Sequence, residues 1–359
     1  MTKERIAGID IIKTLAVFFV ICVHFSLNTA FYETDFSGIG MFAQTVFRNL
    51  FLSCIPLFLM CTGYLERDKE LSGPYYLKLL RVLIPYLIIS AICLIYRVSQ
   101  GENIGLRKTL LYISGFTADG YSWYINMYIG LFLLIPLFNL AVRSMDKKQF
   151  LLALGSLIFL ISLPLTVNPV TALFRKTEFI RFPDWWKMIY PVLYYFVGAF
   201  FAKYPVGIRK AVLIPTVVAI PVLLAGLQFA FSGKTGTNQY SFTDYGSIPV
   251  LLESAAIFLL FSRIKVKSKP VKKTFSFISD QTLEIYLFSF IADSFIYDRF
   301  QTHIQGFDST VQVQVFTRYF IPIVLCSFSA SLLMSSLFRL IYLPARKRVT
   351  DLIAKKRGT

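Results

Sequence analysis

Three polar side chains interrupt the first apolar stretch of the chain. Asp10 and Lys13 are three residues apart, and His24 follows Lys13 after eleven residues. Eleven residues make almost three whole turns of an α-helix, so the three side chains share one helical face, with His24 roughly 16 Å from Lys13 along the axis. Charged groups inside a membrane span are costly and are therefore functional candidates. Because a neutral histidine can take a proton from an alcohol near pH 7, this face predicts a general base.

Apolar segments make up most of the remaining chain and must position this face. Of the 359 residues, 56% are hydrophobic and 16% are charged, and the mean hydropathy is +0.62. These values lie outside the balance of a soluble globular domain. A helix needs roughly 20 apolar residues to cross a bilayer core, and apolar windows predict about ten such spans. Their centres lie near Phe18, Leu57, Ile88, Phe132, Phe159, Tyr195, Val218, Ile257, Leu287 and Val324.

The basic residues give the expected topology. A formal charge of +17 could indicate nucleic-acid binding, but the bases cluster in short segments between the apolar runs, on every second connection. The positive-inside rule places those segments and both termini in the cytoplasm, so the number of spans is even. The cytoplasmic bases are Lys3, Arg5, Arg67, Lys69, Arg143, Lys147, Lys148, Lys203, Arg209, Lys210, Arg263, Lys265, Lys267, Lys269, Lys272, Lys273, Arg346, Lys347, Arg348, Lys355, Lys356 and Arg357.

We therefore expect an all-α, polytopic transmembrane helix bundle in the cell membrane. It forms a single membrane-embedded domain over residues 1–359, in which residues 346–359 are a short basic cytoplasmic tail. Membrane lipids surround it, and no nucleic acid is a partner. The five cysteines all lie in apolar runs, so we expect no disulfide and no metal site.

Two connections do not fit this topology simply. Residues 97–122 are long enough for a surface-lying or re-entrant segment. Residues 168–187 should face outward but are basic, so either a span is miscounted there or these cations meet an anionic partner outside. The cations are Arg175, Lys176, Arg181 and Lys187.

The polar face of the first helix resembles a known signature. The run from Gly8 to Lys13, ten further residues and then His24-Phe25 is similar to the first-helix motif of the acyltransferase-3 family of integral membrane O-acyltransferases. That family usually has Arg where Lys13 stands. Lysine keeps the charge but lacks the planar fork that binds carboxylates or phosphates in two places.

Other segments resemble the family in order and spacing over essentially the whole chain. Lys78-Leu-Leu-Arg81, before Pro85-Tyr86, is similar to its two-base motif. The last family segment often ends in His, where this chain has Ser289, which disfavours a mechanism with a second intramembrane histidine. The remaining similar segments are Pro56 to Leu65, Trp123-Tyr124 with Leu134 to Leu137, and Ser279 to Leu287.

The resemblance implies transfer of an acyl group, usually acetyl from cytoplasmic acetyl-CoA, to a hydroxyl of a cell-surface glycan or its lipid-linked precursor. His24 would be the base, with Asp10 or another carboxylate tuning it. Lys13, Lys78 and Arg81 would bind the phosphates of acetyl-CoA, and the thioester would reach His24 through a protein-lined channel. Some relatives carry a soluble esterase-like domain. Here only the basic tail follows, so we expect transfer directly or to a separate protein.

Plainer interpretations of these residues stay open. Lys78 and Arg81 could anchor a helix at the cytoplasmic boundary, and Thr62-Gly63 could let two helices approach closely. Trp123 and Tyr124 fit an interfacial aromatic belt. Three acidic residues in or near spans could pair with Arg48 or Arg318, and these are Glu253, Glu284 and Asp293.

Two other classes of function compete with an acyltransferase. A transporter or flippase of a surface-polysaccharide precursor also places charged residues near the middle of the membrane, although no internal repeat is visible in the sequence. A sensor or scaffold predicts no turnover of a small molecule. Release of free thiol from acetyl-CoA would separate the three classes.

Overall fold

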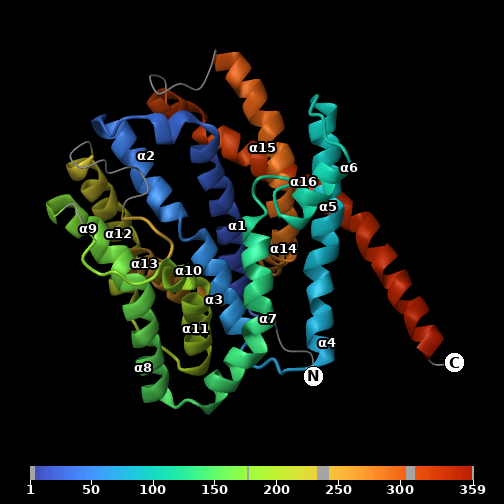
Figure 1. Cartoon of the computed structure of the whole chain (residues 1–359), viewed down its shortest axis with the longest axis horizontal. Helices are drawn as coiled ribbons and strands as arrows, with labels where there is room; N and C mark the ends of the chain where they lie inside the picture. The colour runs from blue at the N-terminus through green and yellow to red at the C-terminus, as the bar shows by residue number, and fades with distance from the viewer. Residues whose placement is uncertain (1–4, 176–177, 233–241, 305–311, 358–359) are drawn as a thin grey trace.

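Every described element of the chain is a helix, as the computed structural model in Figure 1 shows. The structure describes residues 5–175, 178–232, 242–304 and 312–357, and within these ranges it contains no strand. The prediction of an all-α bundle is confirmed. Two bases used in the topology prediction, Lys3 and Lys176, lie outside the described residues.

The helices follow one another with short connections. Up to residue 157 they are α1 (Ala7–Asn28), η1 (Ala30–Glu33), α2 (Gly38–Phe51), α3 (Cys54–Glu66), α4 (Gly73–Tyr76), η2 (Leu77–Leu79), α5 (Leu80–Ser99), α6 (Leu106–Ser114), α7 (Trp123–Ser144) and α8 (Lys147–Leu157). The π-helical segment η3 (Ile158–Ser162) then leads into α9 (Leu163–Arg175), α10 (Asp184–Met188), α11 (Tyr190–Lys203), α12 (Lys210–Phe231), α13 (Ile248–Ser262), α14 (Lys269–Ser279), α15 (Thr282–Ile304) and α16 (Gln312–Arg357).

Seven helical segments of the described chain are long and apolar enough to cross a membrane, which makes the protein a multi-pass membrane protein. They are Ala7–Asn28, Gly38–Glu66, Gly73–Ser99, Trp123–Ser144, Lys147–Ala172, Lys210–Phe231 and Val313–Arg348.

The other three predicted spans coincide with α11, α13 and α15, which do not meet the same criterion. α11 has 14 residues and α13 has 15, so each covers roughly 21 to 22 Å of a bilayer core of roughly 30 Å. α15 has 23 residues, but acidic side chains interrupt it. The count of ten spans and the cytoplasmic side of both termini stay predictions.

Helix α1 lies at the centre of the bundle (Figure 1) and packs against α2, α3, α13, α14, α15 and α16. Its most apolar stretch is 78% buried, whereas that of the peripheral helix α12 is only 28% buried. The polar face of α1 therefore points into protein and not into lipid. Asp10 and His24 are each only 5% exposed.

The backbones of helices α3 and α11 approach each other closely in the core. At Gly63 of α3, a side chain would overlap the carbonyl oxygen of Tyr195, and at Gly198 of α11 it would overlap that of Met60. Small residues let helix backbones approach in this way inside membranes. The close-approach interpretation of Gly63 is confirmed.

The end of the connection between α5 and α7 turns into the bundle. After the exposed helix α6, Ala118, Asp119 and Ser122 are fully buried or nearly so. The Asp119 carboxylate accepts hydrogen bonds from the backbone N–H groups of Tyr121 and Ser122 at 2.9 and 2.8 Å, and another from the Ser122 hydroxyl at 2.6 Å. These bonds fix the loop that precedes α7.

The basic connection before α11 is partly neutralised by its own carboxylates. Lys187 Nζ lies 2.8 Å from Asp184 and 3.8 Å from Glu178. The hydrogen bond with Asp184 is the main cause of the raised pKa of Lys187. One of the four unexpected cations in this connection therefore has anionic partners within the chain itself.

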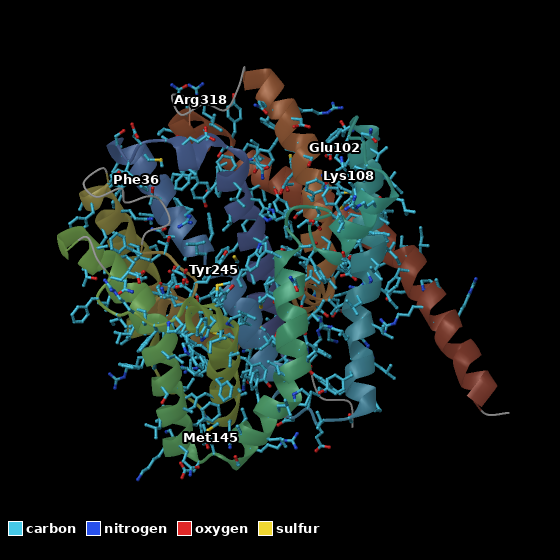
Figure 2. The ribbon with its side chains drawn as sticks, viewed as in Figure 1. Phe36, Glu102, Lys108, Met145, Tyr245 and Arg318 are labelled. Atoms are coloured by element: carbon cyan, nitrogen blue, oxygen red, sulfur yellow. The ribbon has the colours of Figure 1, made fainter. Side chains whose placement is uncertain are left out.

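Residues of connections expected on opposite sides lie at opposite ends of the bundle. Figure 2 shows Phe36 and Glu102 toward one end, whereas Met145 lies at the other. This arrangement agrees with the alternation of the basic segments along the sequence.

The contact between α3 and α11 predicts a strong effect of a single methyl group. Gly63→Ala should lower stability by about 1–3 kcal/mol or more, because the overlap is with backbone, which cannot rotate away. Thermal unfolding in detergent measures the change. Gly130→Ala in α7, where nothing lies within 4 Å, is the matched control and should be neutral or slightly stabilising. Equal stability of the two variants would contradict the close contact.

Candidate active site

A buried histidine and a buried carboxylate form the core of the site. His24 Nδ1 lies 2.9 Å from Asp293 Oδ2, and the two side chains are 6% and 1% exposed. Since a carboxylate accepts hydrogen bonds, Nδ1 carries the proton and Nε2 is left as the proton acceptor. The pairing also stabilises the imidazolium that forms when Nε2 takes a proton.

Two serines complete the surroundings of this pair. Ser327 of α16 donates a hydrogen bond to the second oxygen of Asp293. The Ser289 hydroxyl lies 3.5 Å from His24 Nδ1 and donates to the carbonyl of Tyr286 at 2.7 Å. The pair therefore joins α1, α15 and α16, and the position of Ser289, singled out in the sequence, lies at the histidine.

Tyr121 fixes the plane of the imidazole ring. The rings of Tyr121 and His24 stack with their centroids 3.8 Å apart and an interplanar angle of 24°. Asn28 donates hydrogen bonds to Tyr121 Oη at 2.9 Å and to the His24 carbonyl at 2.8 Å, while Tyr286 Oη donates to the Tyr121 carbonyl. The buried loop before α7 therefore delivers a residue directly to the site.

His24 opens into a cavity of about 350 Å³, which we call the outer cavity. Four of its lining residues are aromatic, and Tyr245, labelled near the middle of the bundle in Figure 2, is one of them. Small-ligand pockets typically have this mixture of rings and a few polar groups. The lining residues are Val20, Val23, His24, Leu27, Asn28, Cys54, Ile55, Gly120, Tyr121, Trp123, Tyr245 and Tyr286.

Two further cavities continue from the outer cavity along α1. The middle cavity, of about 240 Å³, shares Val20, Ile55 and Tyr286 with the outer cavity. The lower cavity, of about 340 Å³, shares Lys13 and Leu65 with the middle one. The three cavities are therefore adjacent, and they run from the first turn of α1 to its last.

Cations gather in the lower cavity. Arg5, Lys13 and Arg67 line it together with Asp10 and Asp280. Both carboxylates bind Arg5, at 2.7 and 2.9 Å. Lys13 forms neither an ion pair nor a hydrogen bond with any described residue, although it lines two of the cavities. An anion that entered the lower cavity would therefore meet an amine that is not already engaged by a described residue.

The structure does not bring Asp10 to His24. The two residues are fourteen positions apart on one helix, or roughly 21 Å, and Asp10 is held by Arg5. The carboxylate at His24 belongs to Asp293 instead. Sequence reasoning left the partner of Asp293 open, because nothing in local periodicity links residues that are 269 positions apart.

Neither Lys78 nor Arg81 lines any of the three cavities. Lys78 is half-buried, with Nζ 5.9 Å from the centre of the Tyr75 ring. Arg81 is exposed, and its neighbour Val82 lines the middle cavity. Of the three cations predicted to bind the donor, only Lys13 lines one of these three cavities. Arg5 and Arg67, which the sequence marked only as topological bases, are there as well.

The other acidic residues of the spans have different surroundings. Glu284 lies 4.0 Å from Arg339. Glu253 is fully buried, and its carboxyl oxygens have no hydrogen-bond partner among the described residues. Neither lines one of the three cavities.

Comparison with known proteins gives one match. Residues 6–337 match the model of a family described as an acyltransferase domain. No match was found among curated proteins or among solved structures. The matched range includes His24, Asp293 and all lining residues of the three cavities except Arg5.

The contact between His24 and Asp293 predicts coupled losses of stability. His24→Ala and Asp293→Ala should each cost about 1–3 kcal/mol, because each leaves a buried polar partner unpaired. The double variant should lose less than the sum, with a coupling energy of about 0.5–3 kcal/mol. Thermal unfolding of the four proteins measures it. His24→Ala combined with Leu154→Ala in peripheral α8 should be additive, and additivity of the first pair as well would rule out the contact.

Proposed function

Because the chain belongs to the acyltransferase-3 family and is a membrane acyltransferase, we propose that it is an O-acetyltransferase. It transfers acetyl from cytoplasmic acetyl-CoA to a hydroxyl of a cell-surface glycan or of its lipid-linked precursor. The family match covers residues 6–337, which is nearly the whole chain.

The series of three cavities along α1 carries the proposal. Coenzyme A has phosphates at one end and the thioester at the end of a flexible arm. The lower cavity offers basic side chains, the middle cavity is the smallest of the three and partly aromatic, and the outer cavity contains His24. With roughly 16 Å between Lys13 and His24 along the axis, a donor held at the lower end can extend its arm toward the base.

His24 acts as the base in this proposal. Nε2 takes the proton of the acceptor hydroxyl as its oxygen attacks the thioester carbonyl, and Asp293 stabilises the imidazolium. The tetrahedral intermediate collapses with cleavage of the carbon–sulfur bond, and the imidazolium returns the proton to the departing thiolate. The products are the acetyl ester and free coenzyme A, so atoms and charge balance.

Lys13, Lys78 and Arg81 bind the donor phosphates. The Lys13 amine lines the lower cavity and is not engaged by a described residue, and Arg81 is exposed next to Val82 of the middle cavity. Charge-assisted hydrogen bonds to phosphate are among the strongest polar contacts. Asp10 acts at this end too, where it orients Arg5.

The outer cavity receives the acceptor. Trp123, Tyr245 and Tyr121 line it, and their apolar rings with polar edges suit a sugar, which has apolar faces and polar rims. Asn28 adds an amide to the same wall. Each substrate therefore approaches His24 from its own end of the series.

The general test follows thiol release from acetyl-CoA by the purified protein, with and without candidate glycans. Acceptor-dependent release is expected from the wild type, and His24→Ala should lower it about 10²–10⁴-fold, since it removes the base. Asp293→Asn should lower turnover in the same direction. A transporter, flippase or scaffold would release no thiol with any glycan. If His24→Ala turned over at the wild-type rate, the assignment as an acetyltransferase would stand, but His24 would not be its base.

The phosphate contacts predict a separation of binding from turnover. If Arg81 holds a phosphate through a contact worth about 1.5–3 kcal/mol, Arg81→Ala should raise the apparent constant for acetyl-CoA about tenfold or more. Turnover at saturating donor should change much less, because the contact is equal in ground and transition states. Lys78→Ala should have the smaller effect.

Lys210→Ala is the matched control for these two variants, because Lys210 is exposed at the start of α12. It should leave the donor constant unchanged. If Arg81 only anchors its helix, Arg81→Ala should lower the yield of protein while the remaining protein keeps the wild-type donor constant.

A further inference from the structure

Three buried side chains lie where the outer cavity, which contains His24, meets the middle cavity. Val20 of α1, Ile55 of α3 and Tyr286 of α15 are the residues that line both the outer and the middle cavity. They are only 4%, 2% and 6% exposed. Val20 is four residues from His24 and seven from Lys13, or roughly 6 Å and 10 Å along the axis.

At this position the protein must meet two opposing requirements, which are to exclude ions and to admit the acyl group of the donor. A continuous wet path between the lower and outer cavities would let protons and ions cross the membrane. A hydrophobic constriction prevents this by excluding water. The donor, however, must bring its carbonyl past the same constriction to meet an acceptor hydroxyl at His24.

We propose that Val20, Ile55 and Tyr286 form an apolar septum that closes the path to ions and selects the acyl group by its width. The selection of the acyl group rests on the proposed function, whereas the barrier to ions does not depend on it. Tyr286 is the fixed wall, because its hydroxyl donates to the carbonyl of Tyr121. Val20 and Ile55 are the aliphatic walls, from two other helices.

Width, and not length, is what the septum can sense. The acyl group is the tip of the donor and enters the septum first, and the unbranched sulfur end of the coenzyme A arm follows it. A straight acyl chain is about as wide as this arm, whereas a branched or aromatic acyl group is wider. The septum therefore admits acetyl and straight acyl groups and rejects isobutyryl and benzoyl groups.

The first test compares isobutyryl-CoA with acetyl-CoA as donors. One methylene in an apolar site changes selectivity about 10–200-fold. Val20→Ala and Ile55→Ala should each raise kcat/KM for isobutyryl-CoA relative to acetyl-CoA about tenfold or more. The ratio for butyryl-CoA should change much less. An unchanged isobutyryl ratio in both variants would overturn the selection by width.

The chain offers matched controls for both substitutions. Val17 and Leu57 are fully buried on the same two helices and line none of the three cavities. Val17→Ala and Leu57→Ala remove equivalent packing, so they should lower stability without a change in the donor ratio. A ratio that shifts equally in the controls would mean that loosening of the core, and not the septum, alters selectivity.

The second test needs no substrate. In proteoliposomes with a pH-sensitive dye inside and an imposed potassium diffusion potential, Ile55→Ala and the double variant with Val20→Ala should leak protons faster than the wild type and the two controls. Equal leak rates would overturn the barrier. If the wild type transfers no acetyl group, the proposed function fails, and the leak measurement still decides whether the septum closes the path.

Discussion

The burial of polar groups along α1 is the constraint on which the rest of the structure depends. A charged or polar side chain in an apolar interior is stable only when it finds a partner. Asp10 finds Arg5, and His24 finds Asp293, so partners from the N-terminal segment and from α15 must lie against the first helix. The central place of α1, wrapped by six other helices, follows from this need. Lys13 is the exception, since no described residue pairs with its amine, which lies where two cavities meet.

Local periodicity predicted more of the fold than of the site. The face of α1 was predictable, because helical spacing is a property of adjacent turns, and so were the apolar cores of the seven long apolar segments. Local periodicity did not predict the boundaries of α11 and α13, which decide whether these helices cross the membrane. The two helices have only 14 and 15 residues and depend on their neighbours for burial. Lys187 was an anomaly in the sequence, yet Asp184 is its partner within the same connection.

The residues around His24 show why the site was harder to predict. Asp293 and Tyr121 come from segments 269 and 97 residues away, and only the packing of α15 and of the loop before α7 brings them together. The family resemblance marked His24, Lys78 and Arg81 in order along the chain. It did not distinguish residues in a cavity wall from residues beside one. Asp10 illustrates the difference, because it shares a helical face with His24 but lies roughly 21 Å away.

If the protein has the proposed function, the distance between the basic residues of the lower cavity and the outer cavity determines how much charge crosses the membrane in each turnover. The phosphates stay at one end, so the acyl group is what travels through the low-dielectric region between Lys13 and His24. In each turnover the acyl group moves outward from sulfur to oxygen, formally as a cation, and the hydroxyl proton moves inward to sulfur. The two movements carry equal charge in opposite directions and therefore cancel. The reaction is therefore electrically silent. The membrane potential neither drives nor opposes it, and the free-energy difference between the thioester consumed and the ester formed sets its direction.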